Sequence, residues 1–221
     1  MKKMFIIIAI LATIFVGMII YKKTAVGAKD NINIQEIEKI EEYISKIYMW
    51  QEVTNEALPV FEDINQAPEI WVWEVINQNL ENYEITYEEI EQTAKNIFGQ
   101  EFTKTFPKEG SETIKYNEEI QMYYTTGMGL DEDSDTFLLN DIKKTKEGYE
   151  VEIVEYLENY SEEQSVIIKN LDNEEIGRVG INDSETKMQE IVKANIDRFS
   201  KKKIYLKSEK DTLIVQKVEN K

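Results

Sequence analysis

The stretch from Thr86 to Gly99, TYEEIEQTAKNIFG, has the strongest signal for a regular element in this chain. It opens with Thr86-Tyr87-Glu88-Glu89, a capping box in which the first and fourth residues satisfy each other's backbone N–H groups. Apolar residues then recur at the three- and four-residue spacing of one helix face: Tyr87, Ile90, Ala94, Ile97 and Phe98. Gly99 is the residue type favoured just past a helix end. We therefore predict a helix over residues 87–98.

Two further helices are predicted before this one. A second capping box, Asn33-Ile34-Gln35-Glu36, precedes isoleucines at helical spacing, which predicts an amphipathic helix from residue 33 to about residue 53 or 58, ended by Pro59. Pro68 suits the first turn of the next helix, whose residues 70–80 are apolar around most of the circumference. Such a helix is buried on more than one side.

After residue 113 the hydrophobic period changes toward two, which is typical of strands. The candidates lie at residues 120–125, 137–143, 149–156, 165–171, 174–179, 203–207 and 213–218. Turns are predicted at Asp172-Asn173 and at residues 208–211, and a fourth helix capped by Asp183 or Ser184 interrupts the strands. Helices first and strands after predict an α+β fold, with helices packed on a mainly antiparallel curved sheet.

Residues 4–20 (MFIIIAILATIFVGMII) are an uncharged run with lysine pairs at both ends. As a helix the run reaches about 25 Å, which predicts a single-pass transmembrane anchor. The alternative is a signal peptide cleaved near Ala28, but Lys22 and Lys23 separate that site from the apolar run and favour the uncleaved anchor. Because a short basic N-terminus normally stays in the cytoplasm, the C-terminal domain is expected to be extracytoplasmic, at the cell membrane.

The chain is thus predicted to comprise a membrane anchor over residues 1–23, a linker over 24–32 and one α+β domain over 33–221. Its order of elements, with the Tyr87-Glu88-Glu89-Ile90 helix ending at Phe98-Gly99 behind a lysine-flanked anchor, resembles uncharacterised envelope proteins of low-GC Gram-positive bacteria. It is also similar to the cystatin-like and nuclear transport factor 2-like folds, in which helices pack into the concave face of a curved sheet. The resemblance covers most of residues 33–221 and transfers no functional residue, because no family motif is matched residue by residue.

Composition excludes several classes of function. With 43 acidic and 26 basic residues the formal net charge is −17, and the one basic cluster, Lys201–Lys203, is interpreted as a solvated helix end, so no nucleic-acid partner is expected. The chain contains no Cys and no His, which excludes thiol nucleophiles, disulfides, most zinc and haem sites and every imidazole relay.

Three tryptophans, Trp50, Trp71 and Trp73, are candidate partner-binding residues, because Trp is a frequent interface anchor. The alternative is core packing, the usual role of aromatic residues at helical spacing.

Asp131, Asp133 and Asp135 form a candidate Ca²⁺ site, because a hard cation prefers oxygen ligands from alternate positions. A calcium loop needs Gly and Glu where this chain has Thr136 and Ile142, so a solvated turn is the alternative. No other cofactor is expected.

The leading hypothesis for function is a non-catalytic, membrane-anchored module that binds a protein or envelope partner. One alternative is a carboxylate-based cell-wall hydrolase, which requires two acidic side chains in one cleft. The other is a divalent-cation-responsive module built on the three aspartates.

Overall fold

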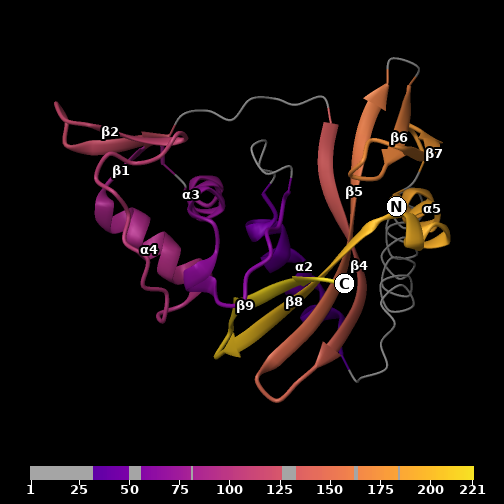
Figure 1. The fold of residues 1–221 in the computed structure, drawn as a ribbon, viewed down its shortest axis with the longest axis horizontal. Helices are drawn as coiled ribbons and strands as arrows, with labels where there is room; N and C mark the ends of the chain where they lie inside the picture. Colours follow the sequence, from indigo (N-terminus) through magenta and orange to yellow (C-terminus); the bar gives the residue numbers. More distant parts are fainter. Residues whose placement is uncertain (1–31, 50–55, 81, 126–132, 162–163, 184) are drawn as a thin grey trace, which may run out of the picture.

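A computed structural model describes residues 32–49, 56–80, 82–125, 133–161, 164–183 and 185–221. Over these residues the fold is α+β, with antiparallel sheets and four α-helices (Figure 1). The helices are α2 (Ile34–Ile47), α3 (Glu69–Gln78), α4 (Tyr87–Phe98) and α5 (Glu185–Ala194), with short 3₁₀ turns η1 (Ile64–Gln66) and η2 (Ile196–Arg198).

Both predicted capping boxes are present. Asn33 and Glu36 exchange hydrogen bonds at the start of α2, and Thr86 and Glu89 do so at the start of α4. Gly99 ends α4 with a φ of 89°, and its N–H donates to the carbonyl of Lys95. These contacts place the boundaries of α4 where the sequence predicts them.

Two predicted helix boundaries are wrong. The first helix ends at Ile47, because Tyr48 is extended. The N–H of Met49 donates to the carbonyl of Ala57, a contact that one continuous helix to residue 58 would not allow. Pro68 is the N-cap of α3 and lies just outside its first turn.

The larger sheet has six strands built around β5 (Gly148–Ser161). One edge of β5 pairs along its length with β4 (Asp133–Lys144), and the other is shared by β8 (Ser200–Glu209) and β6 (Ser165–Lys169). The outer strands are β9 (Thr212–Asn220), beside β8, and β7 (Glu175–Gly180), beside β6. All these pairings are antiparallel, as predicted.

A separate sheet of three short strands, in the order β1 (Glu84–Ile85), β3 (Met122–Thr125), β2 (Ile114–Asn117), lies beside α3 and α4 (Figure 1). The sequence predicts one sheet, so this is a correction. Its physical reason is that β1 is only two residues long, too short for a period-two signal.

The core joins both sheets to the helices. The larger cluster of buried residues includes the inner faces of α2, α3 and α4, Ile85 and Tyr123 of the small sheet, and Val151 and Ile153 of β5. A smaller cluster lies on the other face of β5, at Val154 and Tyr156, and includes Val192 of α5. The central strand is therefore covered on both faces.

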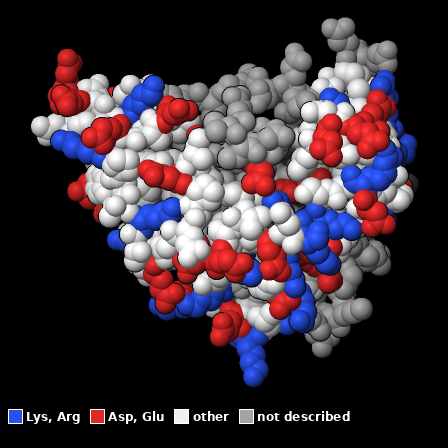
Figure 2. Space-filling view, in the orientation of Figure 1, with Lys and Arg blue, Asp and Glu red and all other residues white. Residues whose placement is uncertain are grey.

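Lys201–Lys203 belong to β8 and do not form a helix end. Side chains alternate across a strand, so Lys202 points inward and is 3% exposed, whereas Lys203 lies on the other face and pairs with Glu150. In the view of Figure 2, lysines and arginines are interspersed with acidic side chains.

Candidate functional site

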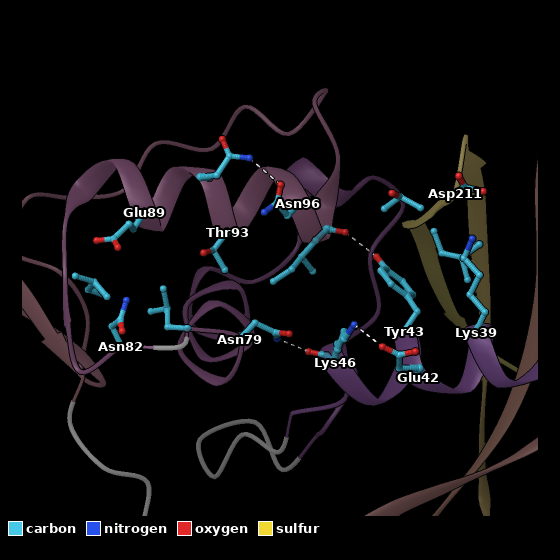
Figure 3. A pocket seen from close by; sticks show the side chains of 16 residues that line it. Lys39, Glu42, Tyr43, Lys46, Asn79, Asn82, Glu89, Thr93, Asn96 and Asp211 are labelled. Atoms are coloured by element: carbon cyan, nitrogen blue, oxygen red, sulfur yellow. Dashed lines mark hydrogen bonds and ion pairs between the residues drawn. The ribbon is translucent and has the colours of Figure 1, made fainter.

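A cleft of about 770 Å³ opens between α2, the end of α3, α4 and the β8–β9 turn (Figure 3). We call it the amide groove, because its uncharged polar lining is mostly carboxamide: Asn79, Asn82, Gln92 and Asn96, with Thr93 and Thr212. Charged side chains of both signs also line it: Lys39, Lys46, Glu42, Glu89 and Asp211. Its volume is within the usual range for ligand pockets, about 300–1,000 Å³.

Two helices form its long walls. The row on α2 runs from Lys39 to Lys46, and the row on α4 runs from Glu89 to Asn96, in each case with residues three and four positions apart. Such a row follows one helix face for about 10 Å, at about 1.5 Å per residue. That length matches about three residues of extended polypeptide, at about 3.3 Å each.

Several polar groups of the groove are partly or wholly unpaired. Asn79 donates to the carbonyls of Lys46 and Val75 at 2.9 and 2.7 Å, and Gln92 Nε2 donates to Asn96 Oδ1 at 2.7 Å. These bonds leave the Asn96 amide N–H groups and the Gln92 oxygen free within the described part of the chain.

The side chains of Asn82, Thr93 and Thr212 likewise have no hydrogen-bond partner among the described residues. The groove therefore presents both donors and acceptors to a ligand.

Tyr43 fixes the groove to the rest of the molecule. Its hydroxyl donates to the carbonyl of Ile97 at 2.9 Å and accepts from the N–H of Val215 at 2.8 Å, so it joins α2 to the end of α4 and to β9. Burial raises the pKa of this hydroxyl, which keeps it protonated and able to donate. One buried hydroxyl on α2 thus links that wall of the groove both to the α4 wall and to β9.

The two described tryptophans are core residues. Trp71 is fully buried, its Nε1 donates to the carbonyl of Ile47 at 3.1 Å, and its ring lies 5.5 Å from Phe61. Trp73 is 2% exposed and packs edge-on against Phe106. Core packing is therefore the description that fits both, and neither presents a surface to a partner. Trp50 lies outside the described residues.

A second, polar cleft of about 450 Å³ is lined by the start of β8, the end of β9, Glu155 of β5, the connection between β6 and β7, and Glu56. We call it the Lys202 cleft. Its floor contains two buried ionisable groups, Glu155 at 1% and Lys202 at 3% exposure. Lys202 Nζ lies 3.4 Å from Glu56, and Ser200 Oγ donates to Glu155 Oε2 at 3.1 Å. Burial raises the pKa of Glu155, and the charge of Lys202 opposes that shift.

Of the three proposed Ca²⁺ ligands, the structure describes only the backbone of Asp133 and Asp135. Asp133 and Asp135 lie in β4, paired with Asn159 and Leu157 of β5, so the backbone there is strand and not turn. Asp131 and the side chains of the other two lie outside the described residues. No group of three acidic side chains suited to a metal ion occurs in the described part of the chain. The Ca²⁺ site remains a prediction.

Sequence reasoning missed both clefts, although each left a signal. On α4, uncharged polar residues at Gln92, Thr93 and Asn96 share one face beside the apolar stripe, where charged residues are more usual. On β5, Glu155 interrupts a run of buried apolar residues, and charges are rarely buried without a role.

Comparisons with known proteins identify no relative. No family model matches the chain, and neither a curated protein nor a solved structure is significantly similar to it. None of the helices in the described ranges has the length and apolarity to cross a membrane, and residues 4–20 lie outside those ranges.

Proposed function

We propose that this chain is a membrane-anchored, extracytoplasmic module that binds an extended segment of a partner polypeptide in the amide groove, without catalysis. The observation that supports the proposal is the set of unpaired carboxamide and hydroxyl groups along a groove of peptide length. A peptide backbone offers one donor and one acceptor per residue, and a carboxamide side chain offers the complementary pair. Recognition of this kind depends little on the partner's sequence.

The charges of the groove would set the partner's orientation. Glu89 lies at one end of the α4 row, and Asp211 lies beside Lys39 at the far end (Figure 3). Charges at the rim of a binding site steer and orient a ligand more than they increase its affinity. Leu80, Ile85 and Leu213 also line the groove and offer apolar contacts to the partner.

A thiol-labelling experiment tests on which side of the membrane the domain lies. Because the chain has no Cys, Lys221→Cys introduces a single thiol. We expect a membrane-impermeant thiol reagent to label it in intact cells to the same extent as after lysis, because residues 4–20 anchor the chain with its C-terminus outside. Labelling only after lysis would place the domain in the cytoplasm and contradict the proposal.

The groove is tested with a displayed library of random peptides presented to the full-length chain in detergent. Peptides that are selected should bind at least about tenfold more weakly to Thr93→Trp, which fills the groove. They should bind about two- to tenfold more weakly to Asn96→Ala, which removes a free donor. Thr186→Trp, on α5 away from the groove, is the matched control and should leave affinity unchanged. An absence of selected peptides, or binding that Thr93→Trp does not weaken, would refute the groove as a polypeptide site.

A carboxylate-based hydrolase is the second candidate, because Glu56 and Glu155 line one cleft. Its weakness is accessibility. Glu155 is 1% exposed and accepts a hydrogen bond from Ser200. Glu56 is therefore the only one of these two carboxylates that a substrate can reach. Glycoside hydrolysis normally needs both carboxylates at the scissile bond.

A further inference from the structure

The three-stranded sheet lies at one end of the molecule (Figure 1), and one of its faces packs toward α4. On that face Tyr123 of β3 is 3% exposed, and its ring lies 6.3 Å from the ring of Tyr87 on α4. Side chains alternate across a strand, so Met122 and Tyr124 lie on the opposite face, which we call the outer sheet face. Tyr83, just before β1, is 64% exposed, and its ring lies 6.3 Å from that of Tyr124. Tyr and Met are enriched at protein interfaces, so the centre of this face has the composition of a contact surface.

Two charges of opposite sign flank the centre of the outer sheet face. Glu84 of β1 and Lys115 of β2 both pair in register with Tyr124, one on each side of it. Both side chains are exposed, and neither has an ion-pair partner among the described residues. Adjacent strands lie about 4.8 Å apart, so the two residues are separated by about 10 Å between their Cα atoms. The face thus presents a row of one negative, one aromatic and one positive side chain.

A second copy of the same face complements this row. When two such sheets stack face to face about a two-fold axis parallel to β3, Glu84 of each copy lies opposite Lys115 of the other. The two Tyr124 side chains then meet near the axis. A two-fold axis perpendicular to β3 would instead place Glu84 opposite Glu84 and Lys115 opposite Lys115, and like charges facing each other are unfavourable. The charges therefore select one of the two arrangements.

We propose that the chain forms a two-fold homodimer through the outer sheet face, with Glu84 of each copy paired with Lys115 of the other. Stacked sheets pack about 10 Å apart, a spacing that a glutamate and a lysine can bridge by extending from the two sides. None of the residues of this face lines the amide groove, so the dimer does not depend on the polypeptide proposal.

The size of the face sets the strength of the dimer. β2 and β3 have four residues each and β1 has two, so the buried area is smaller than the roughly 800 Å² per partner of a standard interface. The dimer is therefore weak, and the chain is largely monomeric in dilute detergent. The proposed anchoring of both copies in one membrane raises their effective concentration, so the membrane is the place to test for it.

Cross-linking through single cysteines tests the face. The chain has no Cys, so Met122→Cys introduces one thiol, on the outer sheet face and close to the proposed axis. A thiol cross-linker with a reach of about 10 Å, the spacing of stacked sheets, should join two full-length Met122→Cys chains in membranes of expressing cells. Lys146→Cys, exposed in the turn between β4 and β5, is the control and should give much less dimer. Equal dimer yields from the two variants would refute the face as an interface.

Charge reversal tests the pairing. In the Met122→Cys chain, either Lys115→Glu or Glu84→Lys sets like charges opposite each other at two contacts, so each should lower the cross-linked fraction at least about threefold. Co-expression of the two reversed chains, differently tagged, restores both pairs and should recover the cross-linked fraction as a heterodimer. Lys146→Glu, a matched reversal away from this face, should have no effect. Reversals that leave the fraction unchanged, or co-expression that does not recover it, would overturn the proposal. Should a reversed chain fail to fold, the comparison of Met122→Cys with Lys146→Cys decides.

Discussion

Trp71→Ala is expected to lower the free energy of unfolding by about 3–5 kcal/mol, the usual cost of deleting a large buried aromatic side chain. Trp71 has no exposed surface, and its ring contacts Phe61 and Phe98 at centroid distances of 5.5 and 5.7 Å. The substitution also leaves the carbonyl of Ile47 without its donor. It therefore opens a cavity where α2, α3 and the end of α4 meet, and adds an unpaired polar group.

Urea unfolding of the full-length chain in one detergent, followed by far-ultraviolet circular dichroism, measures the effect. Tyr83→Ala is the matched control, because Tyr83 is 64% exposed and its loss should change the unfolding free energy by less than about 0.5 kcal/mol. If Trp71→Ala cost less than about 1 kcal/mol and instead abolished partner binding, the interface role predicted from the sequence would be the better description.

The parts of the fold that follow from local chemistry were predictable. The capping boxes at Asn33 and Thr86, the Gly99 helix end and the turn at Asp172-Asn173 each depend on neighbours in sequence, and the structure confirms all four. The end of the first helix was not predictable in this way. Its apolar spacing continues toward Pro59, whereas in the structure the N–H of Met49 bonds to Ala57, eight residues away in the sequence.

The functional clefts depend on tertiary contacts that no local pattern reveals. Asn82 and Asp211 line one groove although they are far apart in the sequence, because the β8–β9 hairpin packs against α4. The predicted strand begins at Lys203, whereas β8 begins at Ser200. Lys201 and Lys202 have no strand-like composition, so their place in β8 shows only through pairing with β5. The inward direction of Lys202 follows from that pairing.

Lys202→Ala is expected to lower the free energy of unfolding by up to about 3 kcal/mol at neutral pH, because it leaves Glu155 buried without a nearby positive charge. The sign of the pH dependence follows from the carboxyl group. Burial already raises the pKa of Glu155 above its ordinary value of 4.5, and losing Lys202 raises that pKa further. The folded variant then binds a proton that the unfolded chain releases, so its stability is greatest in acid and falls as the pH rises above 4.5 through the folded pKa.

The difference in stability between Lys202→Ala and the unmodified chain should therefore be small near pH 4.5 and grow toward pH 8, when urea unfolding is repeated across that range. Taking the difference cancels other groups, such as Glu36, whose pKa is held at about 2 by hydrogen bonds from Lys144 and the N–H of Asn33. Adding Glu155→Gln should recover most of the loss and remove its pH dependence, because the neutral amide has no charge to bury. Lys203→Ala, on the other face of β8, does not change the surroundings of Glu155 and should show no such slope. A slope that survives in the double variant would mean that Glu155 is not the group responsible.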